Sequence, residues 1–217
     1  MRKVLAEAEK KDLTEVETKR LDKMKKLANY YVEATQLAYR MTEWSKSLPK
    51  GSPRFLIASG GGPGIMEAAN RGAYLARGTS IGLNIALPFE QSPNRYITHS
   101  LSFDFNYFFM RKYWFTYLAK ALAVFPGGFG TVDEIFELLT LKQTHKLNKP
   151  MPIVFYGKEY WNSLINFDAF VEWGVIDESD MEFVFFADTV DEAYDYLTQY
   201  LNNLYMEGSG PTGNFIP

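Results

Sequence analysis

The sequence predicts an α/β protein with a Rossmann-like parallel sheet flanked by helices, in a single domain. Short apolar segments alternate with helical segments, an order typical of parallel strands joined by right-handed crossovers. Two of the expected strands end in glycine-rich turns, at residues 59–64 and 126–130, and a helix follows each turn. Ligands of such sheets bind beyond the carboxyl ends of the strands, so we expect both turns on one binding rim.

The first firm element is a helix expected from Thr14 to about Lys46. It begins with the pattern Thr-x-x-Glu, in which the two side chains satisfy the first free N–H groups of a helix. Its apolar face recurs at helical spacing and consists of Leu21, Met24, Leu27, Tyr31, Ala34, Leu37, Ala38 and Met41. We therefore expect residues 1–52 to form an N-terminal helical segment, in which residues 1–12 are a frayed or accessory helix.

Residues 53–204 are expected to form the Rossmann-like domain, followed by a flexible tail at 205–217. Apolar runs bounded by turn residues predict the strands 54–58, 80–87, 121–125, 150–157 and 182–187. Helical periodicity and start signals predict the helices 65–76, 103–119, 131–146, 160–170 and 189–204. Residues 88–100 are expected to be a long loop, the kind of segment that often carries binding residues.

The expected helix 103–119 is rich in aromatic residues and apolar on nearly all sides. Such a helix is expected to be buried in the core or at a subunit interface. It nevertheless contains Arg111 and Lys112, and two adjacent cations are costly to bury unless anions meet them. Two interpretations stay open: a structural ion pair with a carboxylate, or an Arg111 that points to the glycine-turn rim and meets a phosphate or an acid there.

Composition excludes several classes of function. The formal charge of −3 gives no reason to expect binding to nucleic acid or to an anionic membrane. The absence of cysteine excludes disulfides, thiolate nucleophiles and cysteine-ligated zinc. His99 and His145 belong to no metal-ligand spacing, and no serine stands in a nucleophile elbow. The sequence has no apolar signal core and no run long enough to span a bilayer, so we expect a cytoplasmic protein.

The glycine turns do not complete the usual nucleotide fingerprints. Gly60, Gly62 and Gly64 are followed by Glu67 instead of the third glycine of G-x-G-x-x-G, and Asn84 stands where an acidic residue would hold a ribose. A P-loop is also absent, so dinucleotide binding and P-loop NTPase activity are disfavoured. Unshielded N–H groups at the start of a helix still suit an anion, and a phosphorylated small molecule is the leading ligand.

The residues after the second turn have two interpretations. Thr131 and Glu134 fit a capping box, in which they only start a helix. The same four residues, Thr-Val-Asp-Glu, recur at 189–192 without a glycine turn before them. The tetrapeptide alone therefore predicts a helix start, and the functional signal is its fusion to the glycine turn.

Three segments resemble a known family. PGGFGTVDE at 126–134 matches the PGGxGTxxE signature of the Lonely Guy family, the cytokinin riboside 5′-monophosphate phosphoribohydrolases. GGGPGIME at 60–67 is similar to the first glycine loop of that family, and Met-Arg-Lys at 110–112 is similar to its arginine motif. The resemblance covers about residues 53–200 and is closest to the longer bacterial branch. It implies that the domain at 53–204 is a nucleotide-binding catalytic domain.

The resemblance implies a Rossmann-like fold, a homodimer or higher homo-oligomer, and hydrolysis of a purine nucleoside 5′-monophosphate to base and ribose 5-phosphate, with no cofactor or metal. By the same resemblance, AMP or a cytokinin riboside monophosphate is the substrate, and Arg111 and Glu134 are the catalytic pair. The substrate-binding residues that it implies are Gly61, Gly62, Lys112, Gly127, Gly128, Gly130 and Thr131. Many relatives carry the label lysine decarboxylase, but nothing in the sequence indicates pyridoxal chemistry.

The chain departs from the family in one respect. Family members begin with a strand and a glycine–serine turn that faces the nucleotide, and no such turn is found before residue 53. Either that segment is missing from this chain, or the site is incomplete.

A rival function is a non-catalytic carrier of a nucleotide or phosphorylated cofactor, similar to the molybdenum-cofactor carriers. A carboxylate beside Arg111 favours the enzyme, since a pure anion binder gains nothing from it. A nucleosidase with another base preference also stays open.

Overall fold

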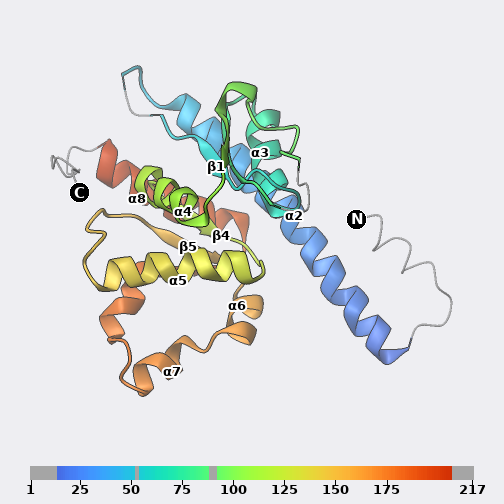
Figure 1. The fold of residues 1–217 in the computed structure, drawn as a ribbon, viewed down its shortest axis with the longest axis vertical. Helices are drawn as coiled ribbons and strands as arrows, with labels where there is room; N and C mark the ends of the chain where they lie inside the picture. The colour runs from blue at the N-terminus through green and yellow to red at the C-terminus, as the bar shows by residue number, and fades with distance from the viewer. Residues whose placement is uncertain (1–13, 52–53, 88–91, 207–217) are drawn as a thin grey trace.

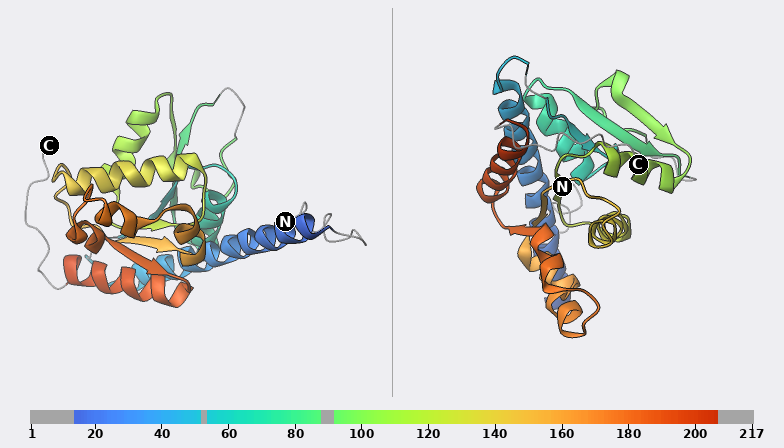
Figure 2. Two further views of the ribbon diagram at one scale, coloured as in Figure 1. Left: turned by 90° about the horizontal axis from the view of Figure 1, so that it is seen from below. Right: turned by 90° about the vertical axis from the view of Figure 1, so that its left-hand side faces the viewer.

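The computed structural model describes residues 14–51, 54–87 and 92–206, and it has the predicted architecture of parallel strands and helices (Figure 1). The described part begins with helix α2, Glu15–Ser47. Thr14 caps this helix, and Thr14 and Glu17 make both hydrogen bonds of the predicted capping box. The N-terminal part of α2 projects beyond the rest of the molecule (Figures 1 and 2). The helix predicted at 1–12 lies outside the described residues.

The first half of the domain is a three-stranded sheet in the order β1-β2-β3. Its elements are β1 Ile57–Ser59, α3 Ile65–Leu75, β2 Ser80–Ile85, the 3-10 helix η1 His99–Leu101 and β3 Ser102–Phe105. Helix α3 packs on α2, and the three strands run parallel. Residues 88–91 of the predicted long loop lie outside the described part.

The second half is a three-stranded parallel sheet in the order β4-β5-β6. Helix α4 Phe108–Leu118 leads into it from β3. Its elements are β4 Leu122–Val124, α5 Phe129–Gln143, β5 Ile153–Tyr156, α6 Lys158–Leu164, α7 Phe167–Glu172, the 3-10 helix η2 Glu178–Phe183, β6 Val184–Ala187 and α8 Val190–Tyr205. Of the predicted tail, residues 207–217 lie outside the described part, and Tyr205 still belongs to α8.

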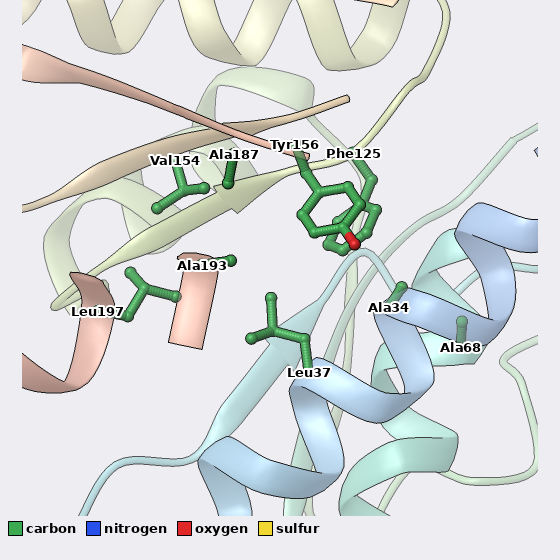
Figure 3. Close-up of a cluster of buried hydrophobic side chains, with 9 residues drawn as sticks. All are labelled: Ala34, Leu37, Ala68, Phe125, Val154, Tyr156, Ala187, Ala193 and Leu197. Atoms are coloured by element: carbon green, nitrogen blue, oxygen red, sulfur yellow. The ribbon is translucent and has the colours of Figure 1, made fainter. Parts of the chain in front are cut away.

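Alternate residues of β5 face two separate apolar clusters, as the period of a strand requires. Val154 and Tyr156 pack with residues of α2, α3 and α8 (Figure 3). Ile153 and Phe155 pack with the residues of α5, α6 and α7 in the second cluster. Because α2 contributes to the first cluster and also packs on α3, the predicted N-terminal helical segment belongs to the same folded body as both sheets.

Strands β1 and β4 each lie at an edge of their own sheet, and they do not pair with each other. In the common six-stranded Rossmann order, 3-2-1-4-5-6, strands 1 and 4 are neighbours at the point where the order reverses. Here β1 and β4 each have one edge without a ladder partner within the described residues. Ala58 and Ala123, the central residues of these strands, are exposed. The division lies beside both glycine turns, because one follows β1 and the other follows β4.

The aromatic segment differs most from its prediction. Residues 102–105 form strand β3, and the helix begins only at Phe108. Burial of this helix in the core is wrong for the single chain, because Arg111 is its one buried residue. Most of its large apolar side chains are exposed, namely Phe108, Phe109, Met110, Tyr113, Trp114, Tyr117 and Leu118. Apolar composition does not distinguish a core helix from one that presents its face to another surface.

No helix in the described ranges combines the length and the apolar character needed to cross a bilayer.

Candidate active site

The second glycine turn places the start of α5 at the carboxyl end of β4. Gly128 is the N-cap of α5, and its carbonyl accepts hydrogen bonds from the N–H groups of Thr131 and Val132. A Cβ on Gly127 would lie 2.2 Å from Oγ1 of Thr131, so only glycine lets Thr131 pack against the turn. Gly128 and Gly130 have open space at the Cβ position. The first N–H groups of α5 therefore stand at an accessible helix terminus, which favours an anion.

Glu134 does not cap α5, so the capping-box interpretation of residues 131–134 is wrong. The helix begins before Thr131, and its N-cap has no side-chain hydrogen bond. The identical tetrapeptide at 189–192 does form a capping box, in which Thr189 accepts from the N–H of Glu192 and Glu192 accepts from the N–H of Thr189. The glycine turn moves the helix start forward, and Glu134 is thereby left one turn too deep to reach the terminal N–H groups.

Glu134 instead forms an ion pair with Arg111. Nη2 of Arg111 lies 2.7 Å from Oε1 of Glu134, and the two side chains are 10% and 37% exposed. The guanidinium reaches the first glycine turn as well, because a Cβ on Gly60 would lie 3.9 Å from Nη1. Nε of Arg111 is buried without a hydrogen-bond partner. The pair thus joins α4 and α5 beside the first turn, with the carboxylate partly open to solvent.

The surroundings of Glu134 make its carboxylate more basic than a free one. Burial raises the pKa of Glu134 above its ordinary value of 4.5, and it outweighs the opposing effect of the Arg111 and Lys112 charges. A buried carboxylic acid is harder to ionise because its charged form loses solvation. A carboxylate of raised pKa is suited to accept a proton from water.

Lys112 lies between two other carboxylates of α5. Its Nζ is 2.7 Å from Oδ2 of Asp133 and 2.8 Å from Oε2 of Glu137. Burial lowers the pKa of Lys112, but the two carboxylates outweigh it, so the net shift is upward. Lys112 therefore ties α4 to α5 in parallel with Arg111, and its contact with substrate stays a prediction.

A buried hydrogen-bond network shapes the first glycine turn. Nδ2 of Asn94 donates to the carbonyls of Gly61 and Gly62 at 3.0 and 3.1 Å, and it also donates to Oδ1 of Asn70. The backbone N–H of Asn94 donates to the Gly61 carbonyl at 2.8 Å. Oγ of Ser59 donates to Oδ1 of Asn70 and accepts from the Gly61 N–H. The carbonyls of the turn are thus held toward the protein interior.

Gly61 has a conformational reason to be glycine. Its φ is +74°, and a Cβ there would lie 1.7 Å from Oδ1 of Asn84. Both of its backbone polar groups already bond to Ser59 and Asn94. The predicted substrate contacts of Gly61 and Gly62 stay predictions. No sequence pattern indicated the supporting residues Asn70 and Asn94, since an asparagine in a helix or loop is commonplace.

An apolar cavity of about 840 Å³ adjoins the second turn. Its wall includes Gly127 and Gly128, the α5 residues Val132 and Phe136, and apolar residues of α6 and α7. Glu134 lies two residues from each of these α5 residues, about 200° away around the helix, and so faces the opposite side. The cavity and the Arg111–Glu134 pair therefore flank α5 on different faces.

In the part of the chain that the structure covers, no group of three or more histidine or carboxylate side chains is arranged so that it could hold a metal ion.

The parallel strands, with a glycine turn and a helix after each of β1 and β4, define a Rossmann-like protein. The profile of the family described as "Possible lysine decarboxylase" matches residues 66–197. The chain belongs to this family, which is the Lonely Guy family that its motifs resemble.

Two curated relatives agree with this assignment. The chain is 35% identical over 81 residues to the probable cytokinin riboside 5′-monophosphate phosphoribohydrolase LOG4 of Oryza sativa subsp. japonica, which covers 37% of this chain and 35% of the relative. It is 35% identical over 83 residues to cytokinin riboside 5′-monophosphate phosphoribohydrolase LOG3 of Arabidopsis thaliana, with 38% of each chain covered. The match spans little more than a third of the length of these relatives.

Among solved structures, the fold is similar to the molybdenum cofactor carrier protein of Chlamydomonas reinhardtii. The TM-score is 0.56, with 20% identity over 80% of this chain and 89% of the other. At this identity the likeness concerns the fold alone.

The network around Asn94 can be tested by Asn94→Leu. This change removes the side-chain donor to the Gly61 and Gly62 carbonyls and to Asn70, while Gly61 keeps its bond from the Asn94 backbone, so we expect the free energy of unfolding to fall by about 1–3 kcal/mol. Urea unfolding measures the loss, and Asn148→Leu, at an exposed asparagine, is the matched control. An Asn94→Leu protein as stable as the control would contradict the structural role of the network.

Proposed function

We propose that this chain hydrolyses the N-glycosidic bond of a purine nucleoside 5′-monophosphate, AMP or a cytokinin riboside monophosphate, to the free base and ribose 5-phosphate. The observation that carries the proposal is the Arg111–Glu134 ion pair beside the first glycine turn, one helical turn beyond the second. The names of the curated relatives support the same reaction.

The mechanism follows from the charge that develops during bond cleavage. As the bond from ribose C1′ to the base nitrogen breaks, positive charge develops on the ribose, and a fixed carboxylate nearby stabilises it. Glu134 takes this role and also accepts a proton from the water that attacks C1′, while the departing base takes up a proton. Arg111 orients the ribose hydroxyls or the phosphate. The N–H groups of the second turn bind the phosphate, remote from the reacting bond.

A carrier of a nucleotide or phosphorylated cofactor is the second candidate. The fold likeness to the molybdenum cofactor carrier protein is the observation that favours it. A carrier would bind its anion most tightly through an unpaired Arg111, whereas here Glu134 neutralises that charge. Fold alone does not decide function, so we place the hydrolase first.

The first test is Glu134→Gln, assayed by chromatography of a reaction with AMP. We expect the wild-type protein to release adenine and ribose 5-phosphate, and Glu134→Gln to lose about a hundredfold or more in rate, because an amide neither carries the charge nor accepts the proton. Glu192→Gln is the matched control, since it changes the same position of the same tetrapeptide where that tetrapeptide only caps a helix. It should keep its activity.

Two results would count against the hydrolase. Equal losses in Glu134→Gln and Glu192→Gln would indicate a stability effect and not catalysis. AMP binding by wild-type protein in a thermal-shift assay, without release of adenine, would favour the carrier or another base.

The pH dependence of the rate tests the role of Glu134 as a base. The pKa of Glu134 is raised above 4.5, and the carboxylate is the active form, so the rate should rise with pH through a midpoint above 4.5. Arg111→Met removes the charge that lowers this pKa, so the midpoint should move to still higher pH. Lys112→Met should move it in the same direction. A midpoint that Arg111→Met leaves in place would show that another group titrates.

We also propose that the chain forms a homodimer or higher homo-oligomer through the exposed aromatic side chains of α4. These rings lie together on a short helix and offer a second copy an apolar surface. We expect light scattering after gel filtration to give at least a dimer, and Trp114→Glu to shift it toward the monomer. Trp173→Glu, at an exposed ring far along the chain, is the control. A wild-type monomer at tens of micromolar would contradict this.

A further inference from the structure

Two positively charged side chains are buried among the described residues. One belongs to helix α4, and the other makes hydrogen bonds to its end. Arg111 is 9% exposed and lies on α4, and Lys149 is 5% exposed and lies between α5 and β5. Arg111 has a carboxylate partner. The partners of Lys149 are backbone carbonyls at the C-terminal end of α4.

Nζ of Lys149 donates hydrogen bonds to the carbonyls of Thr116, Tyr117 and Ala119, at 2.7 and 3.0 Å for the first two. The last carbonyls of a helix have no N–H partner within it, and a cation at this end also interacts favourably with the helix dipole. All three donors of the ammonium group are thus used on the last turn of α4 and its C-cap. Lys149 is a C-terminal clamp supplied by a distant segment.

Side-chain packing holds α4 only weakly. Arg111 is its one buried residue, and an eleven-residue helix is marginal without tertiary contacts. Its N-terminal half is tied to α5 by the ion pairs of Arg111 and Lys112. The clamp fixes the other end, about 10 Å along the helix from Arg111 at 1.5 Å per residue. The two attachments together set the direction of the helix and so the place of the guanidinium.

We propose that Lys149 is a positioning residue, which holds the C-terminal end of α4 so that Arg111 is presented to Glu134 and the substrate. The inference rests on the proposed hydrolysis and adds to it a residue outside the family motifs. Lys149 does not touch the substrate. It acts through the helix that carries Arg111.

The charge of the clamp depends on pH near neutrality. Burial, together with the nearby charges of Lys120 and Lys142, lowers the pKa of Lys149 to about 8, while the three carbonyls favour the protonated form. Above this pH the neutral amine loses one donor and its attraction to the helix end. The rate should therefore fall as pH rises through about 8. Arginine at this position would remain charged throughout.

The test compares Lys149→Met and Lys149→Arg in the full-length protein, with Lys146→Met at an exposed lysine as the control. For Lys149→Met we expect a rate about tenfold or more below wild type at pH 7, because small displacements of orienting groups reduce rates strongly. Lys149→Arg should restore most of the rate and should lack the alkaline fall. Hydrogen exchange, read at the α4 amides, should accelerate in Lys149→Met, while β5 stays protected.

Each result decides a separate point. Unchanged exchange of α4 in Lys149→Met overturns the clamp. Faster exchange with an unchanged rate and an unchanged alkaline fall overturns the positioning role but leaves the hydrolase intact. If wild-type protein releases no adenine, the proposed hydrolysis fails, and AMP affinity replaces the rate: affinity equal in wild type and Lys149→Met then overturns the inference. Loss of protection in β5 would mark global destabilisation of Lys149→Met. Lys149→Arg would then decide: the inference stands if this variant keeps most of the rate and lacks the alkaline fall, and it is overturned if the variant does not.

Discussion

The buried guanidinium of Arg111 is the constraint on which the arrangement of the site depends. A cation removed from water needs an anion and hydrogen bonds at close range, because a buried charge without a partner is costly. Glu134 meets this need and thereby fixes α4 against α5, although α4 packs few of its side chains. Helix α4 leads from β3 to β4, so the same contact ties the connection between the two sheets to α5. The pair that is proposed to catalyse the reaction also organises the rim on which it lies.

Local signals account for the parts of the fold that the sequence predicted well. Helices α2 and α8 combine a capping box with a periodic apolar face, and their observed limits agree with the predicted ones within a residue or two. The prediction for the aromatic segment 103–119 was wrong because it rested on composition alone. Nothing local indicated that residues 102–105 would pair with β2, or that the rings of α4 would stay exposed in the single chain. Pairing and exposure depend on the rest of the fold, which tertiary contacts decide.

The candidate site was predictable to the extent that motifs encode it. The glycine turns, Arg111 and Glu134 were identified by the motifs, and the structure brings the last two together. The residues that support them were not identified, because their contacts join distant segments: Asn94 with Gly61, and Lys149 with the end of α4. The tetrapeptide Thr-Val-Asp-Glu shows that a short motif alone does not determine the role of its residues. It caps α8 but not α5, where a glycine turn precedes it and the helix starts earlier.

The divided sheet explains why these long-range contacts matter. In a continuous sheet, the ladder between β1 and β4 would fix the two glycine turns relative to each other. Here the strands do not pair, and the resemblance to the family implies a further strand ahead of α2 that is not found among the described residues. The turns are held instead by side chains: by α2, which packs on α3 and shares a cluster with β5, and by α4 through its ion pairs. The geometry of the site is therefore only as precise as the attachment of these helices, and the proposed clamp of Lys149 at the end of α4 acts alongside the ion pair that Arg111 makes with Glu134 of α5.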